Sequence, residues 1–260
     1  MHPEDAIAVG IDSTSGHKAF TLAAIDRALG VIRLADAEFD EVISFLELQP
    51  RVLVALNTPS HVSTGIVRKH LERGRDAGRA VRGAELREAE FDLHSRGIAV
   101  SGTPQHEAEC PAWMQLGFAL YRGLTRIGFK AYPSSDAACQ WLETHPHAAF
   151  CALLGRSPLP KATLEGKLQR ALVLFERGLG IHDPMSFLEE ITRHRLLNGS
   201  LPTDLVPLAS ELDALVAAYT AWMAFFKPGE LTRLGNKQEG YITLPAGELL
   251  SNYGAQDSPS

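Results

Sequence analysis

Cysteines are scarce in this sequence: Cys110, Cys139 and Cys151 are the three in 260 residues. An odd number of widely separated cysteines argues against a framework of disulfide bonds. The sequence also has no apolar run near the roughly 18 residues that a membrane helix requires, and residues 1–5 are not the basic start of a signal peptide. We therefore expect a cytoplasmic protein with reduced cysteines that does not interact with membranes.

Positive charge is not in excess either, because the formal net charge is −6 at pH 7. Such a chain has no general attraction for a phosphate backbone, so nucleic-acid binding would need a local basic surface. Residues 68–96 are rich in arginine, but acids alternate with the basic residues, which is more typical of a solvent-exposed helix face. The sequence also contains no Gly-x-Ser-x-Gly elbow and no P-loop. These absences argue against the hydrolases and nucleotide-binding proteins that depend on those motifs.

The strongest signal that is present is an apolar run, residues 6–11, which ends at Asp12. A run of this kind predicts a buried strand that carries a carboxylate to the edge of a sheet. Ser13 and Thr14 follow it, and small polar residues are typical of a turn. On this evidence alone, Asp12 is either a turn former or a site residue.

A second apolar run, residues 51–56, ends at Asn57. Between the two runs, residues 18–25 and 30–35 predict an antiparallel meander, and residues 39–48 predict an amphipathic helix. A strand, a helix and a strand in this order form a right-handed parallel crossover, so the second run should lie beside the first. We therefore expect Asn57 next to Asp12, at the sheet edge where α/β proteins place their ligands.

The rest of the chain predicts mainly helices. The helical patterns cover residues 85–96, 113–127, 136–143, 164–178, 185–197 and 208–226, with short strands at 129–132 and 240–245. Asp213 is expected in the first turn of the last helix, where an acid either complements the helix dipole or serves a site, and Glu211 beside it could do the same. We interpret residues 1–253 as a single domain in which 61–112 pass over the active edge, with 254–260 as a disordered tail.

Several short pieces of the sequence, in this order, carry a family resemblance. The pieces are Val9-Gly10-Ile11-Asp12, Ala55-Leu56-Asn57-Thr58-Pro59, Trp113-Met114 with Gly117, Tyr132-Pro133, His145-Pro146, Lys161 with Glu165-Gly166, Asp213-Ala214-Leu215, and Glu239-Gly240-Tyr241-Ile242. Their order resembles the ribonuclease H-like fold, and more narrowly a family of uncharacterised proteins, domain of unknown function 429, that are predicted to be ribonuclease H-like nucleases. The resemblance implies an α/β fold: a mixed sheet of a three-strand antiparallel meander plus parallel strands, flanked by helices and carrying a helical insertion.

The resemblance also implies metal-dependent hydrolysis of phosphodiester bonds. By position, Asp12 and Asp213 match the family's acids and would be catalytic ligands of Mg²⁺ or Mn²⁺, the ions that oxygen ligands suit. The chain departs from the family at Asn57, where an acid is usual. Glu90 and Glu211 are the further acids that could complete the catalytic cluster if the fold brings them in.

Other departures concern positive charge. The family has an acid near the position of Lys130, and a cation there would repel a metal ion but could face a substrate phosphate. Lys130 and Lys161, together with Asn57, Ser13 and Thr14, are therefore candidates for substrate binding. Ser210 also stands where an acid is frequent, so the acidic cluster is weaker than the family pattern.

Three functions remain open from the sequence. The first is a metal-dependent nuclease, weakened by the replaced acids, with nucleic acid as its partner. The second is a catalytically degenerate member that keeps the fold as a nucleic-acid-binding or interaction module. The third is an actin-like phosphotransferase, because Gly10-Ile11-Asp12-Ser13-Thr14-Ser15 resembles the first phosphate-contacting turn of sugar kinases. The sequence does not determine the oligomeric state.

Overall fold

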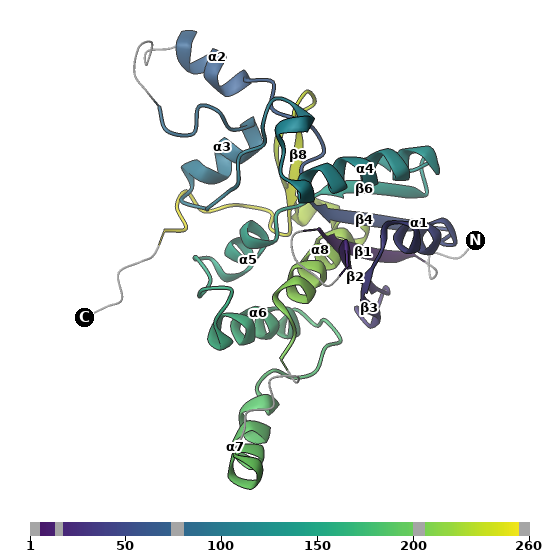
Figure 1. Cartoon of the computed structure of the whole chain (residues 1–260), viewed down its shortest axis with the longest axis vertical. Coiled ribbons are helices and arrows are strands. Elements are labelled where there is room, and N and C mark those ends of the chain that lie inside the picture. The colour runs from purple at the N-terminus through teal and green to yellow at the C-terminus, as the bar shows by residue number, and fades with distance from the viewer. Residues whose placement is uncertain (1–5, 14–17, 74–80, 200–205, 255–260) are drawn as a thin grey trace.

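The computed structural model describes residues 6–13, 18–73, 81–199 and 206–254, which form a sheet flanked by helices (Figure 1). The sheet has eight strands in the order β3-β2-β1-β4-β6-β8-β7, with β5 paired to β6. The strands are β1 (Ile7–Asp12), β2 (Phe20–Ile25), β3 (Val31–Ala37), β4 (Val52–Asn57), β5 (Lys130–Ala131), β6 (Cys139–Glu143), β7 (Thr232–Asn236) and β8 (Gly240–Leu244). Strands β1 to β3 form an antiparallel meander, and β1, β4, β6 and β8 run parallel. The predicted α/β fold with a ribonuclease H-like mixed sheet is confirmed.

Helices cover both faces of this sheet. The helices are α1 (Phe39–Glu47), α2 (Ile66–Arg73), α3 (Glu88–Ser95), α4 (Ala112–Arg126), α5 (Pro146–Leu154), α6 (Leu164–Glu176), α7 (Ser186–Asn198) and α8 (Ala209–Phe226), with short 3-10 turns at Glu107–Glu109 and Pro228–Glu230. Large side chains of β1, β2 and β4 pack against α1 and α4, whereas small ones such as Ala8 and Ala55 pack against α8 with α5 and α6 behind it. Helix α7 projects away from the sheet (Figure 1). None of the helices in the described ranges has the length and apolar character needed to span a bilayer.

Gly10 explains how closely α8 packs on β1. A Cβ atom at Gly10 would lie 2.0 Å from the carbonyl oxygen of Ala214 and 2.2 Å from the backbone nitrogen of Ala218, so only glycine allows this approach. Side chains alternate along a strand, so Asp12 points to the same face of the sheet as Gly10. The helix that packs on Gly10 thereby places Asp213, the neighbour of Ala214, near the end of β1.

Two predictions about local structure are wrong. Residues 136–143 were expected to be helical, but Cys139–Glu143 form strand β6, which pairs along its length with β4. A short segment with several apolar residues is compatible with either a helix or a strand that has neighbours on both sides. Pairing with other strands in the folded protein decides between these two structures. Asp213 lies in the second turn of α8 rather than the first, because the helix is capped at Leu208.

Candidate functional site

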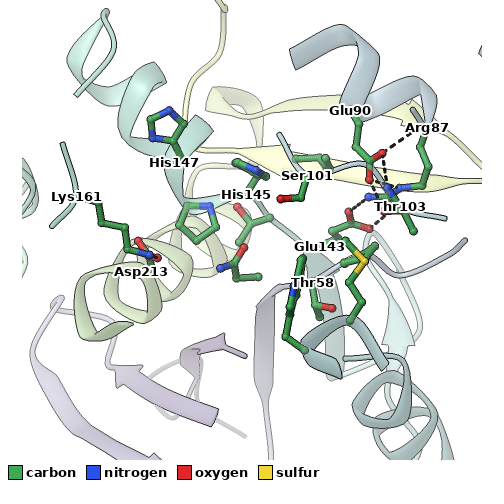
Figure 2. Close-up of a pocket in the computed structure, with 17 residues that line it drawn as sticks. Thr58, Arg87, Glu90, Ser101, Thr103, Glu143, His145, His147, Lys161 and Asp213 are labelled. Atoms are coloured by element: carbon green, nitrogen blue, oxygen red, sulfur yellow. Dashed lines mark hydrogen bonds and ion pairs between the residues drawn. The ribbon is translucent and has the colours of Figure 1, made fainter. Parts of the chain in front are cut away.

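A cavity of about 250 Å³ opens at the carboxyl edge of the sheet, beyond the ends of β4 and β6. Residues of α3, α4, α5 and α8 and of the loops between them line it. Figure 2 shows Lys161 and Asp213 at one side of this cavity, Arg87, Glu90 and Thr103 at the opposite side, and His145 between them. The two sides differ in how their charges are paired.

Asp12 and Asn57 meet at the ends of two parallel strands. They are direct partners in the register of β1 and β4, and the side-chain amide of Asn57 donates to Asp12 Oδ1 at 2.6 Å. Asp12 is buried, with 1% of its surface exposed, and it is Asn57 rather than Asp12 that lines the cavity. The hydroxyl of Ser13 donates to the backbone carbonyl of Asn57 at 3.4 Å, while Thr14 lies outside the described residues. A carboxylate at this edge is therefore fixed in place by the neighbouring strand.

Asp213 adds a second carboxylate from α8. It is buried, and Lys161, from the loop before α6, donates to its Oδ2. Burial raises the pKa of Asp213 to about 6, an effect that Lys161 opposes and the charge of Asp12 reinforces. Ala214, the neighbour of Asp213, packs on Gly10 two residues before Asp12, and the negative charge of Asp12 acts on Asp213. Lys161 is the cation in contact with Asp213, and 43% of its side chain is exposed to solvent.

The donor set at this side suits one hard cation rather than two. Within the described ranges, no group of three or more His, Cys, Asp or Glu side chains is arranged to hold a metal ion. Mg²⁺ retains several waters and is commonly bound by one or two carboxylates together with substrate phosphates. Asp12 and Asp213 are the carboxylates that could hold such an ion, with the carboxamide of Asn57 beside Asp12. The loss of an acid at Asn57 and the presence of Lys161 both argue against a pair of metal ions.

The opposite side of the cavity is built around Arg87, which is 2% exposed. Its Nε donates to Glu90 at 2.8 Å, and its Nη2 and Nη1 donate to the two oxygens of Glu143 at 2.5 and 3.1 Å. Burial alone would lower the pKa of Arg87, but Glu143 and Glu90 raise it above its usual value. Glu90 also accepts from the hydroxyl and the backbone N–H of Thr103. This cluster joins the segment between β4 and α4 to the sheet.

His145 is the titratable group between the two sides. It caps α5, because its Nδ1 accepts the backbone N–H of Ala148 at 3.1 Å. Burial lowers the pKa of His145 to about 4, so the ring is neutral near pH 7. With Nδ1 acting as an acceptor, the single proton of the neutral ring resides on Nε2. His145 is therefore a hydrogen-bond donor of fixed tautomer at the cavity wall.

The remaining predicted site residues lie elsewhere or have other partners. Glu90 lines the cavity, but its two oxygens are engaged by Arg87 and Thr103. Glu211 accepts the backbone N–H of Leu208 at 2.6 Å and so caps α8. Lys130 is exposed, pairs with Asp136 at 2.6 Å and is not among the residues that line the cavity.

Two residues that line the cavity, Glu143 and His145, are not among the site residues predicted from the sequence. Glu143 was hidden because residues 136–143 were interpreted as a helix, although an acid that closes an apolar run is the same signal that identified Asp12. His145 and Pro146 carry the signals of a helix start, with a capping side chain followed by proline at the first helical position. Both signals were available in the sequence.

A comparison with protein families identifies the chain. A family model described as "Protein of unknown function (DUF429)" matches residues 5–240, and the chain belongs to this family. Searches of curated proteins and of solved structures found no match.

Proposed function

We propose that the protein hydrolyses phosphodiester bonds of nucleic acid with the help of one divalent cation, Mg²⁺ or Mn²⁺. The convergence of Asp12 and Asp213 carries the proposal. A strand and a helix distant in sequence place two carboxylates at the edge of an α/β sheet, beside a lysine and a cavity. A family resemblance to ribonuclease H-like nucleases points to the same chemistry.

Five polar side chains in or beside the cavity have a role in this proposal. Asp12 and Asp213 would hold the cation, which when bound activates a water and stabilises negative charge on the phosphate. Lys161 is half-exposed and pairs with Asp213. It would contact the phosphate and supply the positive charge that the second metal ion provides in two-metal sites. His145 would donate from Nε2 to a phosphate oxygen. Asn57 would keep the Asp12 carboxylate oriented.

The second candidate is a nucleic-acid-binding module without catalysis. The direct pairing of Lys161 with Asp213 favours it, because an ammonium group at a carboxylate competes with a metal ion for the same charge. Both candidates use the same cavity, and they differ in whether a cation displaces Lys161 from Asp213.

The test is cleavage of labelled single-stranded, duplex, hybrid and branched nucleic acids with Mg²⁺ or Mn²⁺. We expect cleavage that requires the ion and that falls by about 100-fold or more in both Asp12→Asn and Asp213→Asn. Glu107→Gln is the matched control, since it removes an exposed acid that pairs with Arg122 away from the cavity. Binding of these substrates without cleavage, and without any ion-dependent change in melting temperature, would identify the non-catalytic module instead.

A further inference from the structure

A second cavity, of about 470 Å³, lies beside β6, at the edge where both β5 and β8 pair with it. Strand β5 pairs with the first half of β6, at Gln140 and Trp141, whereas β8 pairs with it at Glu143. The two strands therefore diverge along β6, and the cavity occupies the space between them. Its volume is within the range of sites that bind small molecules.

Aromatic rings from all three strands line this cavity. Tyr132 follows β5, Trp141 belongs to β6 and Tyr241 belongs to β8. Trp141 packs its ring edge-on against Tyr121 in the core, with 4.7 Å between ring centroids, and is only half-buried. Tyr132 and Tyr241 are also half-buried. Rings anchored in a sheet and partly exposed to a cavity form a rigid surface for a flat aromatic ligand.

Positive charge accompanies these rings. The guanidinium of Arg233, on β7, lies 4.2 Å from the ring centroid of Tyr241 and 5.8 Å from that of Tyr132. Arg233 also donates to the carbonyl oxygen of Tyr132 at 3.2 Å, which holds it at the cavity. Lys237 is a second exposed cation in the lining. Glu143 lines the cavity too, but its carboxylate is already bound by Arg87 and Ser60. The charge that remains for a ligand is positive.

The second cavity adjoins the first across a shared wall. Glu143 lines both, and successive residues of β8 face them in turn: Ile242 lines the first, while Tyr241 and Thr243 line the second. This alternation follows from the pleat of the strand. The two cavities are therefore adjacent at one edge of the sheet, and the carboxylate of Glu143 contacts Arg87 and Ser60 between them.

We infer that this second cavity binds an unpaired nucleotide. The base would stack on Tyr241 and Tyr132, and its phosphate would contact Arg233 and Lys237. Base stacking on aromatic residues combined with nearby cations is the general solution for binding single-stranded nucleic acid. The inference rests on the proposed function for its choice of nucleic acid, and adds recognition of a single-stranded base outside the catalytic cavity.

Calorimetric titration of the full chain with adenosine monophosphate, in the presence of a metal chelator, tests this inference. We expect binding of adenosine monophosphate and at least tenfold weaker binding of ribose 5-phosphate and inorganic phosphate. Tyr241→Leu should weaken nucleotide binding by about 5- to 150-fold, the range found for loss of one stacking ring, and Tyr241→Phe should restore it. Arg233→Gln, an exposed change that leaves the core intact, should also weaken binding.

The matched control is Arg33→Gln. Arg33 lies on β3 at the far edge of the sheet, with its guanidinium 4.8 Å from the ring centroid of Phe45, so it has the same kind of contact away from the cavity. Equal affinity for adenosine monophosphate and inorganic phosphate, no binding at all, or equal effects of Arg33→Gln and Arg233→Gln would overturn the inference. Because the titration needs neither metal nor cleavage, it is independent of the nuclease test. Nucleotide binding without hydrolysis would reject only the proposed catalysis. Hydrolysis without nucleotide binding would reject only this subsite.

Discussion

The two sides of the first cavity both place carboxylates beside a cation, but the cations differ. Arg87 is buried and makes hydrogen bonds to both Glu90 and Glu143 with its planar guanidinium. Lys161 is half-exposed and meets Asp213 with a single ammonium group, and the pKa of Asp213 remains raised to about 6. The carboxylates of the Arg87 cluster share a buried guanidinium, whereas the cation paired with Asp213 is a lysine that reaches solvent. A buried carboxylate with a strongly raised pKa in a cleft is typical of functional sites, and a buried ion-pair cluster is typical of structural ones.

The largest expected effect follows from breaking the paired side. Arg87→Met would leave the carboxylates of Glu90 and Glu143 buried without their cation, and should lower the free energy of unfolding by about 3–5 kcal/mol. Denaturant unfolding measures this loss. Arg122→Met is the matched control, because the Arg122–Glu107 pair is exposed on both sides and should contribute about 1 kcal/mol or less. Similar losses in the two variants would contradict the structural role of the Arg87 cluster.

The sequence reveals these two sides unequally. Asp12 and Asn57 end apolar runs, and parallel pairing of two such strands is enough to place them together. Asp213 is predicted as a site residue by the family resemblance, and the small residues of its helix allow that helix to pack on Gly10. The placement of Asp12 and Asn57 needs only local periodicity and one rule of topology, and the antiparallel meander follows from the same periodicity.

The Arg87 cluster depends on contacts that periodicity does not encode. Arg87 and Glu143 are 56 residues apart, and Arg87 also donates to the carbonyl oxygen of Glu239, 152 residues away. Within the arginine-rich segment 68–96, a buried arginine looks the same as its exposed neighbours. Lys161 and Asp213 are 52 residues apart, so their contact is equally invisible. Cation–carboxylate pairing in this cavity is a product of tertiary structure.

The next effect concerns the pH dependence of stability at the Asp213 side of the cavity. In the metal-free protein, the folded state retains a proton on Asp213 up to a pH of about 6, whereas the unfolded chain loses it near the usual aspartate pKa of 3.8. The contribution of this proton to the free energy of unfolding is fully present below about pH 4 and is lost as the pH rises through 6. Asp213→Asn cannot ionise, so it should match the wild type at pH 3.5 and exceed it by up to about 3 kcal/mol at pH 8.

Urea unfolding at a series of pH values measures this difference. Glu107→Gln serves as the control, since its exposed carboxylate should give a nearly constant difference from the wild type. If Asp213→Asn differs from the wild type by the same amount at every pH, the carboxylate of Asp213 is not destabilised by burial, and the contrast with the Arg87 cluster disappears.

The smallest effect distinguishes an acid in α8 that caps the helix from one that serves the cavity. Glu211 accepts the backbone N–H of Leu208, so Glu211→Ala should lower the free energy of unfolding by about 0.5–1 kcal/mol through loss of that bond and of a negative charge near the helix N-terminus. Glu211→Gln keeps the acceptor and should recover most of the loss. Chemical denaturation of both variants, alongside the nuclease assay, compares the two roles. If cleavage drops and stability is unchanged in both variants, Glu211 belongs to the acidic cluster. If only the alanine variant loses stability, Glu211 is a helix cap, and Asp213 is the acid that α8 contributes to the cavity.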